Sequence, residues 1–252
     1  MQTLRFLLRI LDWFPTSQLE SFICDLVARR VAALPADEAL RFLFRLDAAF
    51  YPLQGQMAVA YGGGMHTKHR HMRYHDFFVQ RVKPGERVLD IGCGHGAVAY
   101  DITEKAGAYV TGIDLSPENI QQAHSHHSHP RVRYILGDVL RDLPSEQFDV
   151  IIMSNVLEHL EDRVGFLRRV QAAIQPSRWL IRVPLFERHW SVPLKEELGL
   201  DYRLDLTHHI EYTQEGFADE MQQAGLEIVH QEVRWGEIWA ELKPGEDIDD
   251  NA

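Results

Sequence analysis

The feature that most constrains the fold of this chain is an alternation of short apolar runs with segments of helical composition, which begins at Arg87. Short apolar runs of this kind are typical of buried strands, and the segments between them are long enough for helices. Five such runs follow one another, at residues 88–91, 109–113, 132–136, 148–153 and 179–183. Strands that alternate with helices form parallel sheets with right-handed crossovers and helices on both faces.

Two later apolar runs, 226–235 and 237–242, are close enough in sequence to pair as an antiparallel hairpin at the edge of the sheet. The sequence therefore predicts an α/β fold with a doubly wound, mostly parallel, seven-stranded sheet.

Residues 1–60 predict a helical extension in front of this sheet. Apolar residues recur at helical spacing over residues 4–14, and two further helices are expected over 16–33 and 37–50. The first of these helices is apolar over more than half of its circumference. It must therefore be buried against its neighbours, in a homodimer or on a membrane surface.

The rest of the chain predicts one domain over residues 61–245. Three glycines at 62–64 break the helical pattern, and a further helix is expected over 66–82, before the first strand. The acidic tail at 246–252 is expected to be disordered.

Charge and cysteine content restrict the class of protein. The chain has 26 Lys and Arg against 37 Asp and Glu, a formal net charge of −11, so its surface repels phosphate backbones and disfavours a nucleic-acid partner. Charged residues interrupt every apolar run before the roughly 20 residues that a bilayer-spanning helix needs, and the N-terminus lacks the pattern of a secretion signal. Two cysteines suit a reducing compartment, so we expect a cytoplasmic location.

The first predicted strand runs directly into a glycine-rich loop, Gly92-Cys-Gly-His-Gly96. In a doubly wound sheet, ligands bind at the carboxyl ends of the strands, where glycines let the backbone approach them closely. The spacing of the loop is G-x-G-x-G, whereas dinucleotide-binding loops have G-x-G-x-x-G, with one more residue before the third glycine. Asp90 can hold loop amides or a cationic amino group, and Asp114 ends the next strand, where an acidic side chain accepts hydrogen bonds from ribose hydroxyls. A purely structural turn is the alternative.

These segments carry a family resemblance. Val88-Leu-Asp-Ile-Gly-Cys-Gly-His-Gly96 and Gly112-Ile-Asp-Leu-Ser116 closely resemble the class I S-adenosylmethionine-dependent methyltransferases. Gly137-Asp138 and the segment 148–159 resemble the third and fourth strand ends of that family, and the resemblance covers about residues 87–242. It implies a Rossmann-like fold, S-adenosylmethionine as the cofactor and methyl transfer as the reaction.

The resemblance also implies a set of cofactor contacts. The glycines line the methionine part, Asp114 binds the ribose, Leu115 and Val139 flank the adenine, Asp138 binds its amino group and Asn155 lies beneath the methionine. The implied cofactor-binding residues are Asp90, Gly92, Gly94, Gly96, Asp114, Leu115, Asp138, Val139 and Asn155.

Three residues are the catalytic candidates. Methyl transfer is an in-line displacement that depends on positioning, and an oxygen or nitrogen nucleophile also has to lose a proton. Glu158 and His159 follow the fourth predicted strand, beside the sulfonium in the geometry of the family, so His159 is a candidate base or metal ligand. His208 matches a histidine that lies over the active site of related methyltransferases. Structural roles are the alternative for all three.

A metal site is possible in principle, because small-RNA 2′-O-methyltransferases bind a divalent ion through a Glu-x-x-Glu-His motif and a later histidine. Here Asn155 stands in place of the first glutamate. We therefore predict catalytic roles without a complete metal site. His71 and His75 form a second possible metal pair on the helix 66–82, and the run 124–129 is expected to be a solvated loop.

In similar enzymes the helix before the first strand is a lid over the cofactor, and long inserts build the acceptor pocket. We therefore expect a lid at 66–82 and an acceptor pocket at 184–212, where aromatic and cationic side chains favour a glycan or a hydroxylated small molecule. The predicted function is O-methylation of such a molecule. An RNA methyltransferase with a partial metal site and a non-catalytic cofactor-binding scaffold are the alternatives.

Overall fold

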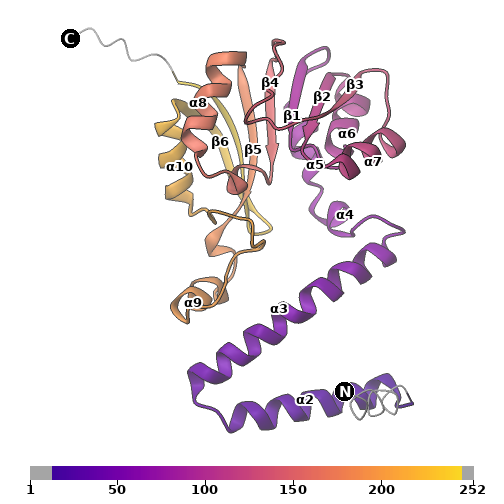
Figure 1. Ribbon diagram of the computed structural model, residues 1–252, viewed down its shortest axis with the longest axis vertical. Coiled ribbons are helices and arrows are strands. Elements are labelled where there is room, and N and C mark those ends of the chain that lie inside the picture. Colours follow the sequence, from indigo (N-terminus) through magenta and orange to yellow (C-terminus); the bar gives the residue numbers. More distant parts are fainter. Residues whose placement is uncertain (1–12, 246–252) are drawn as a thin grey trace, which may run out of the picture.

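The computed structural model describes residues 13–245 (Figure 1), so most of the predicted first helix and the tail 246–252 lie outside the described residues. The helical extension and the segment before the sheet contain α2 (Thr16–Ala32), α3 (Ala36–Tyr61), α4 (Lys68–Met72) and α5 (Tyr74–Val79). The first half of the sheet domain contains β1 (Arg87–Ile91), α6 (Ala97–Ala106), β2 (Tyr109–Asp114), α7 (Pro117–His126), β3 (Val132–Leu136) and β4 (Val150–Ser154). The second half contains η1 (Leu157–His159), α8 (Arg163–Ile174), β5 (Arg178–Pro184), η2 (Phe186–Arg188), α9 (Ser191–Glu197), α10 (Gln214–Gln223), β6 (Leu226–Arg234) and β7 (Glu237–Pro244).

The seven strands form one sheet in the order β3-β2-β1-β4-β5-β7-β6. Strands β1 to β5 pair in parallel, whereas β7 pairs antiparallel with both β5 and β6. The predicted doubly wound, mostly parallel sheet is confirmed, and so is the antiparallel hairpin. Chain order reverses between β1 and β4, so the loops after these two strands meet at the switch point where such sheets bind ligands.

Helices cover both faces of the sheet, and each face has its own apolar core. One core includes fully buried Phe166 and Phe217, from α8 and α10. The other core includes fully buried Phe78 and Ile102, from α5 and α6. β1, β4 and β5 are buried at every position except one end residue each, rather than at alternate positions, as central parallel strands covered on both faces are.

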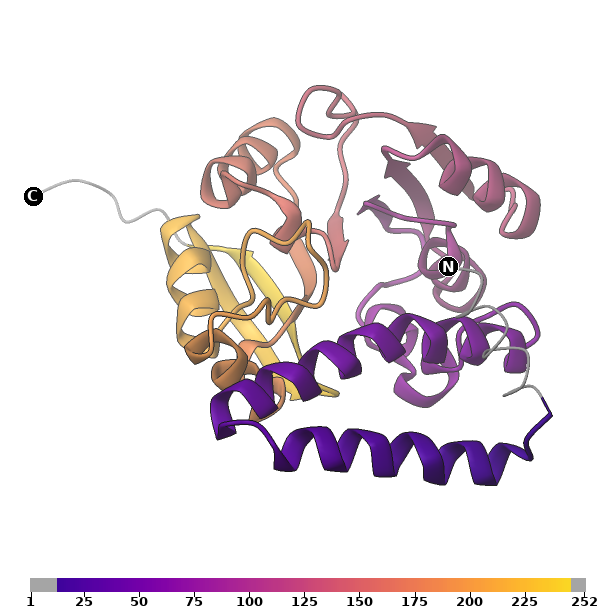
Figure 2. The same ribbon diagram turned by 60° about the horizontal axis from the view of Figure 1, so that its bottom comes forward.

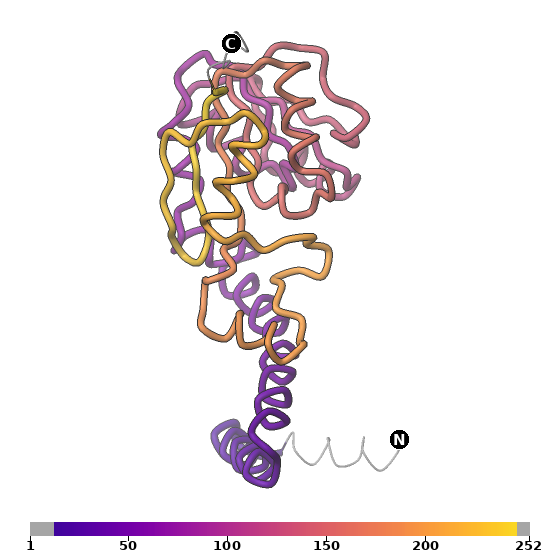
Figure 3. The backbone as a smooth tube through the Cα atoms, turned by 90° about the vertical axis from the view of Figure 1, so that its left-hand side faces the viewer, coloured from indigo at the N-terminus to yellow at the C-terminus, as the bar shows by residue number. Residues whose placement is uncertain are grey.

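The helical extension lies apart from these two cores. Figure 3 shows that α3 leads away from the sheet, with α2 at its far end. Figure 2 shows that α2 runs back alongside α3. α2 has no buried residue, and α3 has one, Ala39. α3 continues through Pro52 to Tyr61 and is therefore longer than the predicted helix 37–50.

The predicted continuous helix over 66–82 is wrong. The segment forms two short helices, α4 and α5, which are separated by Arg73 in the left-handed conformation with φ of 51°. The break lets Tyr74 and the two following phenylalanines enter the core, while the polar residues of α4 stay outside. Packing of these aromatic side chains overrides helix continuity, so His71 and His75 do not share a helix face.

The histidine run also differs from the prediction. α7 extends to His126, and the ring of His127 contacts the backbone oxygen of His95 in the glycine loop, with its Nδ1 atom 2.7 Å away. The run is therefore solvated as expected at residues 124–126 and 128, but it is helical as far as His126, and His127 packs on the loop after β1.

Candidate cofactor and acceptor site

The glycine loop joins β1 to α6 in a shape that only glycine adopts without strain. Gly92, Gly94 and Gly96 have φ of 67°, 54° and 81°. A Cβ atom on Gly92 would lie 2.4 Å from Val156, and one on Gly96 would lie 2.5 Å from the hydroxyl of Tyr134, so both glycines are also required by close packing. A Cβ atom on Gly94 would meet nothing within 4 Å, so this position faces open space.

Asp114, at the end of β2, fixes the loop after β1. One of its carboxylate oxygens accepts a hydrogen bond from the amide of Gly94 at 2.8 Å. The other accepts from the amide of Ser116 at 2.9 Å and from the side chain of Asn119 at 3.1 Å. A carboxylate has about four acceptor positions, so about one remains for a ligand.

A cavity of about 330 Å³ opens beside Asp114, along the carboxyl ends of the central strands. Its walls are largely apolar, and residues of the loops after β2, β3 and β4 line it. The lining includes Gly92, Asp114, Leu115, Asp138, Val139, Asn155, Val156, His159 and Leu160. An apolar slot with an acidic residue at each of two strand ends suits a nucleoside.

Asn155, which lines this cavity, has a left-handed backbone conformation with φ of 57°. Its side-chain oxygen is buried and has no hydrogen-bond partner in the described chain. Asparagine tolerates this conformation better than most residues, and such outliers are concentrated at functional sites.

A second cavity shares Gly92 with the first and is lined by one acidic and one basic side chain, Asp90 and Arg182. Asp90 is almost fully buried, and one of its oxygens has no partner within residues 13–245. Burial, together with the charge of Asp114, raises the pKa of Asp90 to about 8. Arg182 lies on β5, with two guanidinium nitrogens buried and without hydrogen-bond partners in the same described range.

Arg182 is held in place from two sides. Its guanidinium lies 3.9 Å from the centre of the Tyr74 ring, and its Nε atom is 3.6 Å from a carboxylate oxygen of Glu237. Tyr74, Asp90 and Arg182 all line the second cavity. Within residues 13–245, one oxygen of Asp90 and two nitrogens of Arg182 form no hydrogen bond, so this cavity suits the ammonium and carboxylate groups of an amino acid.

A nucleoside slot that continues into an amino-acid slot is what S-adenosylmethionine requires. A family described as "Methyltransferase domain" matches residues 61–231, which is more than half of the chain. The chain belongs to the class I S-adenosylmethionine-dependent methyltransferases. The predicted family and the predicted cofactor are both confirmed.

Individual relatives agree with this assignment. A ubiquinone biosynthesis O-methyltransferase from Bradyrhizobium diazoefficiens is 35% identical over 122 residues, which are 48% of this chain and 47% of the relative. The chain thus matches about half the length of this curated relative.

Two solved structures show the same fold at low identity. The magnesium protoporphyrin IX methyltransferase of Synechocystis PCC 6803, with bound S-adenosylhomocysteine, has a TM-score of 0.55 and 17% identity, and the match covers 69% of this chain and 84% of that one. A chain from a complex between the Haloferax volcanii Trm112 methyltransferase activator and a methyltransferase has a TM-score of 0.58 and 17% identity. That match covers 71% of this chain and 92% of the other.

The residues of the methyltransferase domain fit the cofactor. Gly94 faces open space, Asp90 is an unpartnered buried acid that suits the amino group, and Arg182 suits the carboxylate. When bound, the cofactor supplies an electrophilic methyl group. Asp138, however, is already engaged, because it accepts from the amide of Leu140 at 3.0 Å and lies 3.5 Å from Arg141.

The catalytic candidates of the methyltransferase domain meet beside the nucleoside cavity. Glu158, His159 and His208 each offer one ligand atom within 4.8 Å of the others, although His208 is about 50 residues away in sequence. The rings of His159 and His208 meet edge to face at 4.5 Å. Glu158 is fully buried and both of its oxygens are unpartnered within the described residues, so burial raises its pKa to about 7.

A short relay orients His159. The hydroxyl of Thr207 donates to a carboxylate oxygen of Asp205 at 2.7 Å, so it accepts from Nδ1 of His159 at 2.9 Å. This tautomer leaves Nε2 of His159 without a proton. Burial, and secondly His208, lower the pKa of His159, so the ring is neutral at pH 7 and can accept a proton.

A second network orients His208. Its Nδ1 atom is 2.9 Å from Glu211, and Nε2 is 4.0 Å from Glu158. Glu211 is paired with Arg188 and accepts from the amide of Leu204 at 2.7 Å. His208 is 5% exposed, so its accessibility to an acceptor is lower than that of the partly exposed His159.

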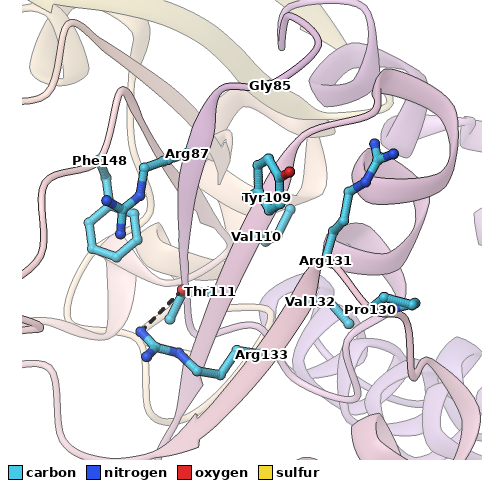
Figure 4. A pocket seen from close by; sticks show the side chains of 10 residues that line it. All are labelled: Gly85, Arg87, Tyr109, Val110, Thr111, Pro130, Arg131, Val132, Arg133 and Phe148. Atoms are coloured by element: carbon cyan, nitrogen blue, oxygen red, sulfur yellow. Dashed lines mark hydrogen bonds between the residues drawn. The ribbon is translucent and has the colours of Figure 1, made fainter.

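Another cavity, of about 470 Å³, lies elsewhere, at the amino ends of β1 to β3 (Figure 4). Ligands of such sheets bind at the opposite edge. Its arginines are already occupied: Arg87 and Arg133 share the carboxylate of Glu146, and Arg131 donates to the backbone oxygen of Gly107. This cavity is therefore a weaker candidate than the cofactor site.

Sequence reasoning left Arg182 inside the predicted strand 179–183 and gave no individual role to Arg182, Thr207, Asp205 or Glu211. A charged residue inside the apolar run 179–183 was the available signal for Arg182, because an arginine in a central strand needs a partner. The relay to His159 had no comparable signal, since its members are distant in sequence.

Proposed function

We propose that this protein transfers the methyl group of S-adenosylmethionine to an oxygen atom of a hydroxylated small molecule, with His159 as the general base. The single observation that carries the mechanism is the relay from Asp205 through Thr207, which leaves Nε2 of a neutral imidazole free beside the cofactor cavity. The acceptor class is supported by the O-methyltransferase from Bradyrhizobium diazoefficiens, whose name places it in ubiquinone biosynthesis.

In this mechanism the chain contributes binding, orientation and proton transfer. Asp114 and the apolar slot hold the nucleoside, while Asp90 and Arg182 hold the amino-acid end, which fixes the methyl group for in-line attack. Nε2 of His159 takes the hydroxyl proton of the acceptor as the oxygen attacks. His208, held by Glu211, is a positioning residue that packs against the ring of His159.

The test is to replace His159 by Ala and to measure S-adenosylhomocysteine formation with a panel of catechols, other small hydroxylated molecules, glycans and RNA. We expect kcat to fall by about 10²–10⁴ with nearly unchanged cofactor affinity. Thr207→Val is the matched control: it breaks the relay but keeps the imidazole, so a smaller loss is expected. Turnover of RNA alone, or full activity in H159A, would contradict the proposal.

A divalent cation at Glu158, His159 and His208 is the second candidate mechanism. It is favoured by the proximity of their ligand atoms and by the two unpartnered oxygens of Glu158. Loss of activity in EDTA that a divalent ion restores would favour the metal; unchanged activity in EDTA would favour the base.

Two other features stay proposals. The cytoplasmic location is supported by the free thiols Cys24 and Cys93. The acidic net charge supports a small acceptor over nucleic acid.

A further inference from the structure

The second half of α3 and the segment after it have an unusual charge distribution. Residues 48–75 contain no Asp or Glu, although the whole chain has 37 of them. Residues 41–75 carry five Lys and Arg against a single Asp, in a chain whose net charge is −11. This region is therefore a local cationic stretch in an acidic protein.

The same region exposes large apolar side chains. From residue 48 to its end at Tyr61, α3 has no charged residue and no buried one. Its exposed large side chains are Phe50, Tyr51, Leu53, Met57, Val59 and Tyr61. Contiguous apolar surface of this kind on a soluble protein marks an interaction site.

The distribution of these side chains around the helix indicates what covers them. Phe50, Leu53 and Met57 follow one another at helical spacing and form one stripe, whereas Tyr51 and Val59 project from other sides, since successive residues turn by about 100°. A partner helix in a coiled coil covers one stripe only. A lipid phase surrounds an inserted helix on several sides, so it fits a helix that is apolar beyond one stripe.

The position of α3 connects this surface with the active site. The beginning of α3 contacts the insert: Arg41 donates to the backbone oxygen of Leu198, and the ring of Phe44 lies 6.5 Å from that of Trp190. Its end leads through α4 into α5, where Tyr74 lines the cofactor cavity. Trp190 itself is exposed.

We propose that the second half of α3, residues 48–61, docks on a lipid bilayer with anionic headgroups and lies in the plane of its surface. None of the helices within residues 13–245 is long and apolar enough to cross a membrane, which agrees with docking in the plane. The apolar side chains enter the interface, aromatic Tyr51 and Tyr61 suit its polar boundary, and Arg70 attracts the headgroups.

The test is co-sedimentation of the full chain with phosphatidylcholine vesicles that contain or lack phosphatidylglycerol. We expect binding that increases with phosphatidylglycerol and decreases with salt. The double variant Phe50→Glu/Met57→Glu should weaken binding at least about tenfold, because two apolar side chains are replaced by anions. The matched control is Val229→Glu/Val233→Glu, which changes two exposed apolar residues of β6 and should bind as the unchanged protein does.

Two further measurements identify other occupants of the surface. If the protein is a dimer in light scattering and F50E/M57E is a monomer, the surface binds a second copy and the proposal is wrong. A decrease of more than about 5 °C in the Tm of F50E/M57E would mean that the surface is covered by this same chain, which also overturns it. Absence of vesicle binding, or equal loss in the β6 control, has the same consequence.

Discussion

A buried guanidinium that packs on an aromatic ring, as that of Arg182 does on Tyr74, needs an anion close by. Its Nε atom lies 3.6 Å from Glu237, but neither Nε nor Nη1 forms a hydrogen bond within the described chain, and Arg182 lines the second cavity. We expect Arg182→Met to weaken binding of S-adenosylhomocysteine by about 10–100-fold, since a charged hydrogen bond contributes about 1.5–3 kcal/mol. Calorimetry with methylthioadenosine, which lacks the carboxylate, should show almost no change. Equal losses for both ligands would mean that Arg182 supports the fold instead.

Asp90 gives the site a pH dependence. Burial raises its pKa to about 8, compared with about 3.9 for an ordinary Asp. Below pH 8 the free protein holds a proton on Asp90 that an incoming ammonium group must displace. Affinity for S-adenosylhomocysteine should therefore rise between about pH 6 and pH 8, and this rise should be absent in Asp90→Asn.

The raised pKa of Asp90 also makes the stability of the fold depend on pH, and this dependence has the opposite sign to that of the ligand affinity. Between about pH 4 and pH 8 the folded protein binds more protons at Asp90 than the unfolded chain does, so the free energy of unfolding of the cofactor-free protein falls as pH rises. Denaturant titrations of D90N should show a weaker decrease over this range. An identical pH dependence in D90N would show that Asp90 is already ionised in the folded state.

At the scale of elements, two glycines of the loop between β1 and α6 have different roles: Gly96 is needed for packing, and Gly94 is expected to be needed for ligand binding. Gly94→Ala should cost only about 1–2 kcal/mol of stability, for the left-handed conformation, because nothing lies within 4 Å of the new Cβ. Its methyl group would project into the open space that the cofactor uses, so binding should be lost. Gly96→Ala should cost about 2–5 kcal/mol, since strain and the clash with Tyr134 add. Thermal unfolding and calorimetry of both variants test this contrast; equal loss of stability would contradict it.

In the segment between α3 and the sheet, one helix was predicted over 66–82, whereas the structure has two short helices, α4 and α5. Composition over 66–82 suits one helix, but Tyr74, Phe77 and Phe78 are drawn into the core and the chain turns at Arg73. Local propensity is a weak determinant when burial of three aromatic rings opposes it.

At the scale of the whole molecule, the helical extension contributes almost nothing to the two cores, which contain no residue from 13–61. A chain that begins at residue 61 should therefore keep its Tm within a few degrees and its affinity for S-adenosylhomocysteine. Scanning calorimetry and isothermal titration on the shortened chain are the measurements. A large fall in Tm would show that the contacts of α3 with Leu198 and Trp190 are essential to the domain.

The sequence by itself determined the sheet, the glycine loop and the family, because these depend on local properties. Each apolar run of strand length, the three glycines of the loop and Asp114 after its apolar run can be recognised from a few consecutive residues. The tertiary structure alone decided which polar groups meet. Arg182 reaches the cavity of Asp90 because β5 lies two strands from β1, and Thr207 reaches His159 because the insert folds back over η1. Such pairs depend on strand order and loop closure, which are set by the packing of the whole chain.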